Sequence, residues 1–377
     1  MRRSVRRVLS LCLVLSLTLA LCIPAFAAGN VCFEDYLMIG DSIGVYCGDP
    51  PKEKYIPVYS NAGMAFPGTY SELLKNDGEL GIQRICSCAH PGWRVQDALY
   101  ALGGENRTSD YMLAFAGDTL DRIQTMRSSF TQGLEDAELI SINLGNNNIF
   151  QPFIYGLYTA FEKESISFEG SCCDKAALDS LKRLQADCSD FEAFADLLGA
   201  LESMERGTVL LKNVLKMLPD SLADYQRSWD DLIRLITTAN PDAKILVLGL
   251  YNPVEYLIND LAGKNLPLSS GGKSLVGGAA KLLNDTLDPV IRAYNNYLRS
   301  GCRYAGKYVY VDVTGVKLDG SKDGLHLGDL GHKYVYGQMK NAIMTHFVSD
   351  AIPAKKLTLP GLLGKVASAV KFIFTWR

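Results

Sequence analysis

The stretch Asp35-Tyr36-Leu37-Met38-Ile39-Gly40-Asp41-Ser42 decides the expected fold of this chain. A short apolar run ends in a glycine, a carboxylate and a hydroxyl, which is typical of a buried strand with polar side chains at its end. We therefore predict a strand from Tyr36 to Ile39. Similar runs predict four more strands, at 82–87, 139–144, 244–248 and 308–313.

The near-continuous apolar character of several of these runs indicates burial on both faces, as in a parallel sheet. A helical pattern from Asp224 to Thr238 is followed by Pro241 and then by a strand, which is the β-α-β order of a doubly wound fold. The predicted fold class is α/β, a three-layer α/β/α arrangement with a mainly parallel sheet. Such folds bind ligands beyond the carboxyl ends of the strands.

Polar residues at these ends suggest a serine nucleophile with its base. A hydroxyl nucleophile requires an imidazole to accept its proton, and the imidazole requires an acceptor that fixes its orientation. Ser42 provides the hydroxyl. Asp323 and His326, three residues apart in Asp323-Gly324-Leu325-His326, provide the orienting carboxylate and the base from one short segment.

Two further segments supply donors for the negative charge of a tetrahedral intermediate. Asn147 lies in the run Leu144-Gly145-Asn146-Asn147-Asn148, which follows the strand predicted at 139–144. Gly92 lies in Pro91-Gly92-Trp93, which follows the strand predicted at 82–87. A glycine at such a position lets a backbone amide approach a ligand closely.

In their order and spacing these residues resemble the SGNH or GDSL hydrolases, whose four sequence blocks contribute Ser, Gly, Asn and His. The resemblance spans about residues 33–348 and implies a flavodoxin-like SGNH fold that cleaves acyl or acetyl esters of glycans or lipids. By that resemblance Ser42, Asp323 and His326 form the catalytic triad. The Ser42 and Gly92 amides and the Asn147 side chain form the oxyanion hole, and neither a metal nor an organic cofactor is required.

Three features depart from the family pattern. Asn148 stands where the family usually has an aspartate. Glycines and prolines at 44, 48, 50 and 51 permit only a turn or two of helix after the serine. A helical insertion is predicted at about 151–220, either as a lid or as a cap packed on the core. The Asn148 departure motivates an alternative function, an inactive carbohydrate- or envelope-binding protein with the same fold.

Gly40-Asp41-Ser42-Ile43-Gly44 also satisfies the G-x-S-x-G pattern of the α/β-hydrolases. That nucleophile elbow normally follows several strands, and its acid lies far from its histidine. In this chain the serine ends the first predicted strand, and Asp323 lies three residues before His326. We therefore reject this interpretation.

The amino-terminal segment predicts export. Four arginines precede an apolar stretch from Val8 to about Leu21, and Ala25-Phe26-Ala27 offers small residues for cleavage, so 1–27 is interpreted as a signal peptide. An uncleaved anchor is the alternative. Leu21 before Cys22 disfavours a lipoprotein cleavage site. The expected location is secreted or associated with the cell envelope.

A single SGNH hydrolase-like domain is predicted from 28 to 350. The chain has 38 Lys and Arg and 41 Asp and Glu, and four of the arginines lie in 1–27, so 34 basic residues remain and the net charge is −7. This charge does not predict nucleic-acid binding. The tail at 351–377 has five basic and no acidic residues on an amphipathic pattern, which indicates contact with a membrane or cell surface or a helix docked on the domain.

Eight cysteines remain after residue 27, and in an exported protein they predict disulfides of unassigned connectivity. A zinc site is the less favoured alternative because the spacings lack a C-x-x-C pair. The substrate is open between two classes. The apolar cap and basic tail favour lipid or envelope esters, whereas Trp93 is suited to stacking on a sugar.

Overall fold

The computed structural model describes residues 33–45, 67–108, 119–152, 218–253, 287–318 and 326–348, with a few isolated positions between them. The chain divides into two compact units, and one of them is Cys32–Ala342. Of the other unit only residues 343–348 are described. The predicted signal peptide, most of the predicted insertion, the basic tail and Asp323 lie outside the described residues.

Five parallel strands form one sheet in the order β2-β1-β3-β4-β5. All neighbours run parallel, which confirms the predicted fold class. The strands are β1 Asp35–Gly40, β2 Arg84–Ala89, β3 Leu139–Asn143, β4 Lys244–Leu248 and β5 Val309–Val311.

The strands lie where the apolar runs predicted them; the bounds of β1 and β3 differ from the prediction by one residue at one or both ends, and those of β2 and β5 differ more. β2 begins at Arg84, two residues later than predicted, because the Gln83 and Arg84 amides both donate to the Glu34 carbonyl before pairing begins. β2 then continues to Ala89, which pairs with Gly40. β5 has only three residues and lies at the edge of the sheet.

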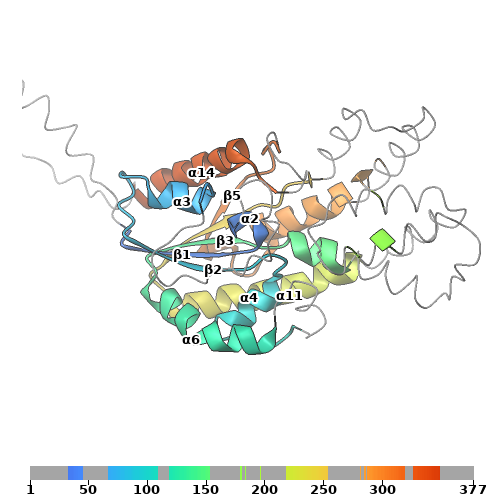
Figure 1. The fold of residues 1–377 in the computed structure, drawn as a ribbon, viewed down its shortest axis with the longest axis horizontal. Helices are drawn as coiled ribbons and strands as arrows, with labels where there is room; N and C mark the ends of the chain where they lie inside the picture. Colours follow the sequence, from blue (N-terminus) through green and yellow to red (C-terminus); the bar gives the residue numbers. More distant parts are fainter. Residues whose placement is uncertain are drawn as a thin grey trace, which may run out of the picture. The chain divides into compact units, whose positions relative to one another are not determined.

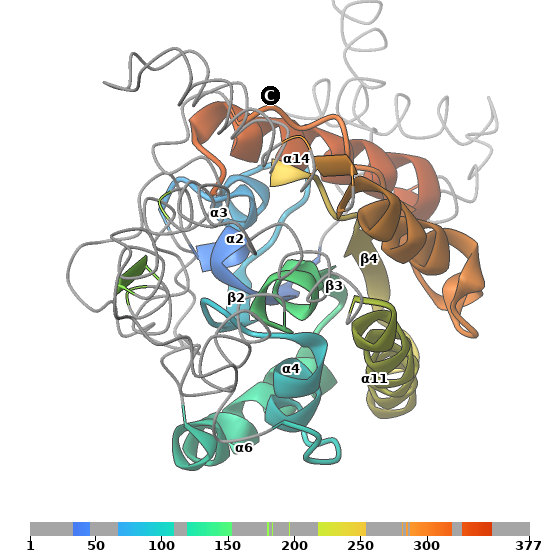
Figure 2. The same cartoon turned by 90° about the vertical axis from the view of Figure 1, so that its right-hand side faces the viewer.

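Helices cover both faces of the sheet and make three layers (Figure 1). One face carries α4 Val95–Ala101, α6 Leu120–Asp136 and α11 Leu218–Ala239. The other carries α3 Tyr70–Lys75 and α14 Asp329–Ile343, as the rotated view in Figure 2 also shows. Shorter elements are α2 Ser42–Val45, η1 Tyr297–Gly301, η2 Ala305–Lys307 and η3 Met344–Val348.

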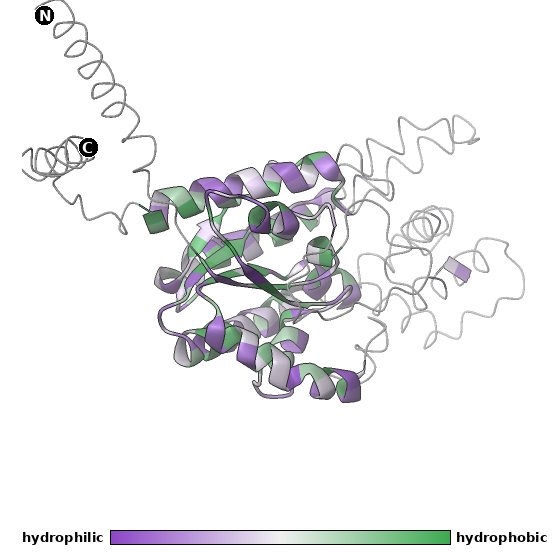
Figure 3. Cartoon of the chain, turned by 60° about the vertical axis from the view of Figure 1, so that its left-hand side comes forward, coloured by the Kyte–Doolittle hydropathy of each residue, from purple (hydrophilic) through white to green (hydrophobic). Residues whose placement is uncertain are grey.

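The two faces of the sheet differ in chemistry. Leu37, Ile39, Ile140 and Ile142 point toward α4, α6 and α11 and belong to one buried apolar core. In Figure 3 the strands are mostly green between helices with purple outer surfaces. The opposite face also holds buried polar groups, since the Tyr36 hydroxyl and Ser141 Oγ are 2.7 Å apart. Burial raises the pKa of Tyr36, so its hydroxyl stays protonated.

Polar contacts hold α14 against α3 on that second face. The Tyr70 amide at the start of α3 donates to His332 Nδ1 at 3.1 Å. The Lys340 ammonium lies 2.7 Å from the Asp77 carboxylate, and the Tyr336 hydroxyl donates to the same carboxylate at 2.7 Å. The helix that follows His326 therefore has a fixed position over the sheet.

The disulfide prediction is wrong for three cysteines, because Cys86, Cys88 and Cys302 are free thiols. Cys86 and Cys88 are on β2, where burial raises the pKa of both thiols. Cys302 donates to Asp230 Oδ1 at 3.2 Å. The other five cysteines after residue 27 lie outside the described residues.

Two searches of the described residues returned no result. No helix among them is both long enough and apolar enough to cross a bilayer. Within the same ranges, no three His, Cys, Asp or Glu side chains gather in a way that suits a metal ion.

Candidate active site

Three adjacent strands deliver the predicted site residues to one edge of the sheet. Gly40 at the end of β1 pairs with Ala89 at the end of β2 and with Asn143 at the end of β3. Ser42 follows the first of these ends, Gly92 the second and Asn147 the third. The sheet order β2-β1-β3 therefore places the serine between the two predicted oxyanion segments.

Ser42 is the first residue of α2. Asp41 fixes this turn because its Oδ1 accepts from the Ile43 amide at 3.0 Å and its carbonyl accepts from the Gly44 amide at 3.1 Å. Helix α2 spans Ser42–Val45, and the glycine and prolines at 48, 50 and 51 that predicted its early end lie outside the described residues. The Ser42 side chain is partly exposed at the end of a buried strand.

Gly92 occupies a tight turn after β2. The Trp93 amide donates to the His90 carbonyl at 3.1 Å, and the φ angle of Gly92 is +78°. This bond and angle, with Pro91 at the second position, are those of a type II turn, whose third position favours glycine. The turn presents the Gly92 peptide at the same sheet edge as Ser42.

Gly145 shapes the segment after β3. Its φ angle is +137°, and an added Cβ would lie 3.0 Å from both Leu250 methyl groups. Residues 146–152 are helical after this glycine, so Asn147 lies in the first turn. Backbone conformation and close packing both require glycine here.

The Asn147 side chain bridges the segments after β1 and β2. Its Nδ2 donates to Asp41 Oδ2 at 3.3 Å and to the Trp93 carbonyl at 3.1 Å. The Trp93 carbonyl is an acceptor, so it fixes which end of the amide faces it. This contact, together with the sheet order, places the Asn147 amide nitrogen beside the nucleophile turn.

Two more amide side chains from the same segment lock the turn after β2. Asn148 Oδ1 accepts from the Val95 amide at the start of α4 at 3.0 Å, and its Nδ2 donates to Gln96 Oε1 at 2.8 Å. Gln151 Nε2 donates to the Gly92 carbonyl. Asn148, the departure from the family pattern, thus supplies an acceptor to a helix amide as an aspartate would.

Asp41 is fully buried beside the candidate nucleophile. Burial raises the pKa of Asp41 to about 7, against the effects of the Ile43 amide and of the positive charge on His326, which lower it. This electrostatic effect of His326 on Asp41 links the fourth predicted block to the residue before Ser42.

His326 is completely buried, with Leu327 buried beside it. It lies just before α14, whose place over the sheet is fixed by the contacts to α3 described above. Asp323, its predicted orienting partner, lies outside the described residues. The structure therefore places Ser42, Gly92 and Asn147 after adjacent strand ends, and His326 within electrostatic range of Asp41.

Trp93 does not have the role of a sugar platform that its residue type suggested. Its side chain is fully buried, with the ring centre 6.2 Å from Phe130 and 5.9 Å from His90. The indole instead anchors the turn that carries Gly92 and holds the carbonyl that receives Asn147 Nδ2.

Sequence reasoning missed Asp41, Gln151 and the role of Asn148. Asp41 stood in the quoted motif, but only tertiary burial gives it a raised pKa. Asn147, Asn148 and Gln151 lie within one turn of each other, so a run of amide side chains just after a strand was the available signal. Their partners lie more than fifty residues earlier.

Comparisons with known proteins give distant structural likenesses. No protein-family model and no curated protein matches the chain. Similar solved structures include an extracellular lipase from Streptomyces rimosus, with 14% identity, a TM-score of 0.38, and coverage of 82% of this chain and 98% of that one. A phospholipase A1 from Streptomyces albidoflavus NA297 is also similar, with 14% identity, a TM-score of 0.37, and coverage of 82% of this chain and 99% of that one.

A family 3 carbohydrate esterase from Clostridium thermocellum is also similar, with 11% identity, a TM-score of 0.30, and coverage of 82% of this chain and 95% of that one. TM-scores below 0.5 do not establish a shared function. The roles of residues in this chain therefore follow from their contacts.

Proposed function

We propose that this protein is a serine ester hydrolase of the SGNH type, with Ser42 as nucleophile and His326 as base. The observation that carries the proposal is the Asn147 amide, held between the buried Asp41 carboxyl and the Trp93 carbonyl beside Ser42. A positive charge on His326 lowers the pKa of the same Asp41 carboxyl. In this proposal nucleophile, base and oxyanion donor act together at one edge of the sheet.

In the first step His326 accepts the Ser42 proton while Ser42 Oγ attacks the ester carbonyl carbon. The carbonyl oxygen becomes an oxyanion. The intermediate then collapses, the alcohol leaves with the proton held by His326, and the acyl group stays on Ser42. Asp323 would orient the imidazole through this transfer.

The oxyanion is received by the Ser42 and Gly92 amides and by Asn147. Asn147 Nδ2 has a 3.1 Å contact to Trp93 and a longer 3.3 Å contact to Asp41. The longer contact is the one that the oxyanion displaces, while the Trp93 contact holds the amide in place. The type II turn and Gln151 fix the Gly92 peptide before substrate arrives.

In the second step water attacks the acyl-enzyme carbonyl and gives its proton to His326. Collapse of that intermediate releases the carboxylic acid and returns the proton to Ser42 Oγ. One ester and one water give one acid and one alcohol. The protein's own side chains carry every proton in this cycle.

Asn148 was the reason to consider an inactive binding protein. The Asn148 side-chain oxygen accepts from the Val95 amide, and its side-chain nitrogen donates to Gln96 Oε1. Both ends of the Asn148 amide therefore hold the turn beside Asn147. These contacts support turnover over the binding-only alternative.

The substrate in this proposal is an acylated glycan or lipid outside the cell. Export through the 1–27 segment, and contact of 351–377 with a membrane or cell surface, belong to the same proposal. Retention of the purified protein on anionic vesicles, compared with a variant truncated after residue 350, tests the surface contact. Equal retention of both forms would remove the tail from the proposal.

The proposal is tested by hydrolysis of p-nitrophenyl acetate and p-nitrophenyl octanoate by purified protein. Ser42→Ala should abolish turnover with folding intact. Ser87→Ala is the matched control, since Ser87 Oγ is buried on β2 without a hydrogen-bond partner, and it should retain activity. Hydrolysis by Ser42→Ala at the wild-type rate would overturn the assignment.

A further inference from the structure

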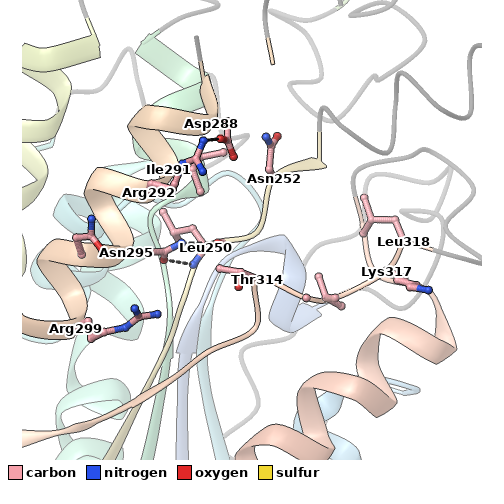
Figure 4. Close-up of a pocket in the computed structure, with 13 residues that line it drawn as sticks. Leu250, Asn252, Asp288, Ile291, Arg292, Asn295, Arg299, Thr314, Lys317 and Leu318 are labelled. Atoms are coloured by element: carbon pink, nitrogen blue, oxygen red, sulfur yellow. Dashed lines mark hydrogen bonds and ion pairs between the residues drawn. The ribbon is translucent and has the colours of Figure 1, made fainter. Parts of the chain in front are cut away.

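A cavity of about 700 Å³ opens beyond the carboxyl ends of β4 and β5 (Figure 4). Its walls come from residues 250–252 after β4, from residues 314–318 after β5, and from the helical segment that contains Asp288 and Arg299. Ligand pockets usually occupy roughly 300–1,000 Å³. The cavity is large enough for a sugar unit or two.

Leu250 connects this cavity to the candidate active site. It lines the cavity, and its methyl groups pack where a Cβ of Gly145 would be. Asn147 follows Gly145 by two residues, and β3 and β4 are neighbours in the sheet. The cavity and Ser42 therefore lie along the same edge of the sheet.

The wall between the two regions is held firmly. The buried Asn295 side chain accepts from the Leu250 amide at 2.7 Å and donates to the Leu250 carbonyl at 2.8 Å. Figure 4 shows this pair of bonds between the helix and the segment after β4. Both hydrogen-bonding ends of Asn295 are used, so this residue shapes the cavity and leaves ligand contact to its neighbours.

Three of the four charged side chains that line the cavity form ion pairs. Arg292 forms an ion pair with Asp288. Arg299 lies 2.9 Å from Asp312 and 4.9 Å from the centre of the Tyr310 ring. In Figure 4 the Lys317 ammonium points away from Leu250 and Thr314. The cavity thus offers many donors and acceptors, and each of these two ion pairs is neutral, while Lys317 adds a positive charge to the lining.

This chemistry suits a neutral polyol. A fatty acyl chain would strip water from both ion pairs and give no hydrogen bond in return. A pyranose has hydroxyl groups that can bond to the exposed Arg292 and the partly exposed Asp288 side chains at the cavity wall. We propose that this cavity binds the sugar of a neutral O-acylated glycan, whose ester lies at Ser42.

Only the position of the ester rests on the proposed function, so sugar binding can be measured without turnover. The probe is xylobiose, a neutral pyranose disaccharide, titrated into Ser42→Ala protein and detected by saturation-transfer NMR and calorimetry. Adding Arg292→Leu should weaken binding about tenfold, the loss of one hydrogen bond to a charged group. Binding that survives this change undiminished would overturn the cavity assignment.

Arg227→Leu is the matched control. Its side chain is 74% exposed in an ion pair with Asp224 outside the cavity, whereas Arg292 is 70% exposed in its pair with Asp288. The control should bind xylobiose as Ser42→Ala alone does. Equal weakening by both substitutions would show a general effect of surface charge and contradict the proposal.

Catalysis separates the two proposals. With Ser42 intact, Arg292→Leu should lower kcat/KM for mono-O-acetyl xylobiose about tenfold and leave p-nitrophenyl acetate unchanged. A fall on both esters, or a preference for p-nitrophenyl octanoate over the acetylated sugar, would overturn the glycan subsite while leaving the hydrolase standing. Xylobiose binding that depends on Arg292 in a protein without esterase activity would support the cavity and refute the proposed function.

Discussion

Replacement of Asp41 by asparagine should make stability depend less on pH. Below about pH 3 the carboxyl is largely protonated in the folded and unfolded states, so its burial costs almost nothing through ionisation. Between pH 4 and pH 7 the unfolded carboxyl ionises while the folded one stays protonated, because burial raises the pKa of Asp41 from 3.8 to about 7. Wild-type stability therefore falls as pH rises through this window.

The size of the effect follows from that shift, at about 1.4 kcal/mol for each tenfold change in the proton equilibrium. Ionisation of Asp41 thus costs the folded state about 4 kcal/mol at pH 8 and less than about 1 kcal/mol at pH 4. Asparagine removes this cost. It also has one acceptor for two donors, the Ile43 amide and Asn147 Nδ2, and the lost bond costs about 1–3 kcal/mol.

Urea denaturation of both proteins at pH 4 and pH 8 tests this reasoning. The difference in unfolding free energy between variant and wild type should be about 4 kcal/mol more favourable to the variant at pH 8 than at pH 4. Asp121→Asn, which removes the charge of an exposed carboxylate in the first turn of α6, is the control. The same difference at both pH values would show that Asp41 burial does not govern its ionisation.

Substitutions at Asn147, Asn148 and Gly92 test the site further. Asn147→Ala should lower kcat about 10²- to 10³-fold with little change in KM. In the control Asn146→Ala, which removes a buried Oδ1 without a hydrogen-bond partner, kcat should stay within about threefold of wild type, and equal effects of the two substitutions would contradict the donor role. Asn148→Asp keeps the acceptor for the α4 amide and should remain active. Asn148→Leu should lower the free energy of unfolding, measured by urea denaturation, by about 2–4 kcal/mol. An equal loss of unfolding free energy in both variants would contradict the contacts described. Gly92→Ala forces an alanine into a left-handed backbone conformation and should lower the free energy of unfolding by about 1–2 kcal/mol and remove much of the activity. Gly78→Ala is the control, because a Cβ there would meet nothing within 4 Å. Unchanged activity of Gly92→Ala would remove Gly92 from the oxyanion hole.

Local patterns predicted the sheet and three residues of its functional edge. Apolar runs that end in turn residues carry information about both the strand and the position of its carboxyl end, so Ser42, Gly92 and Asn147 were found where strands stop. The start of β2 was misplaced because Ile82 continues the apolar run, although pairing begins only after the bonds to Glu34.

The remaining features depend on contacts distant in sequence. The pKa of Asp41 is set by burial under other elements, and the Gln151 contact to Gly92 joins residues 59 apart. The cysteines show the same limit, because composition favoured disulfides whereas Cys302 instead bonds to Asp230. The cavity beyond β4 and β5 arises from two loops and a helix, none of which has a local motif.

The central claim is that Ser42 is an activated nucleophile, and covalent labelling tests it most directly. Purified protein would be treated with a serine-directed phosphonate ester, its residual p-nitrophenyl acetate hydrolysis followed, and the adduct located by peptide mass spectrometry. We expect one phosphonyl group per chain, on Ser42, with activity falling in proportion to labelling. Full loss of activity with Ser42 unmodified, or an adduct spread over several serines, would contradict the account.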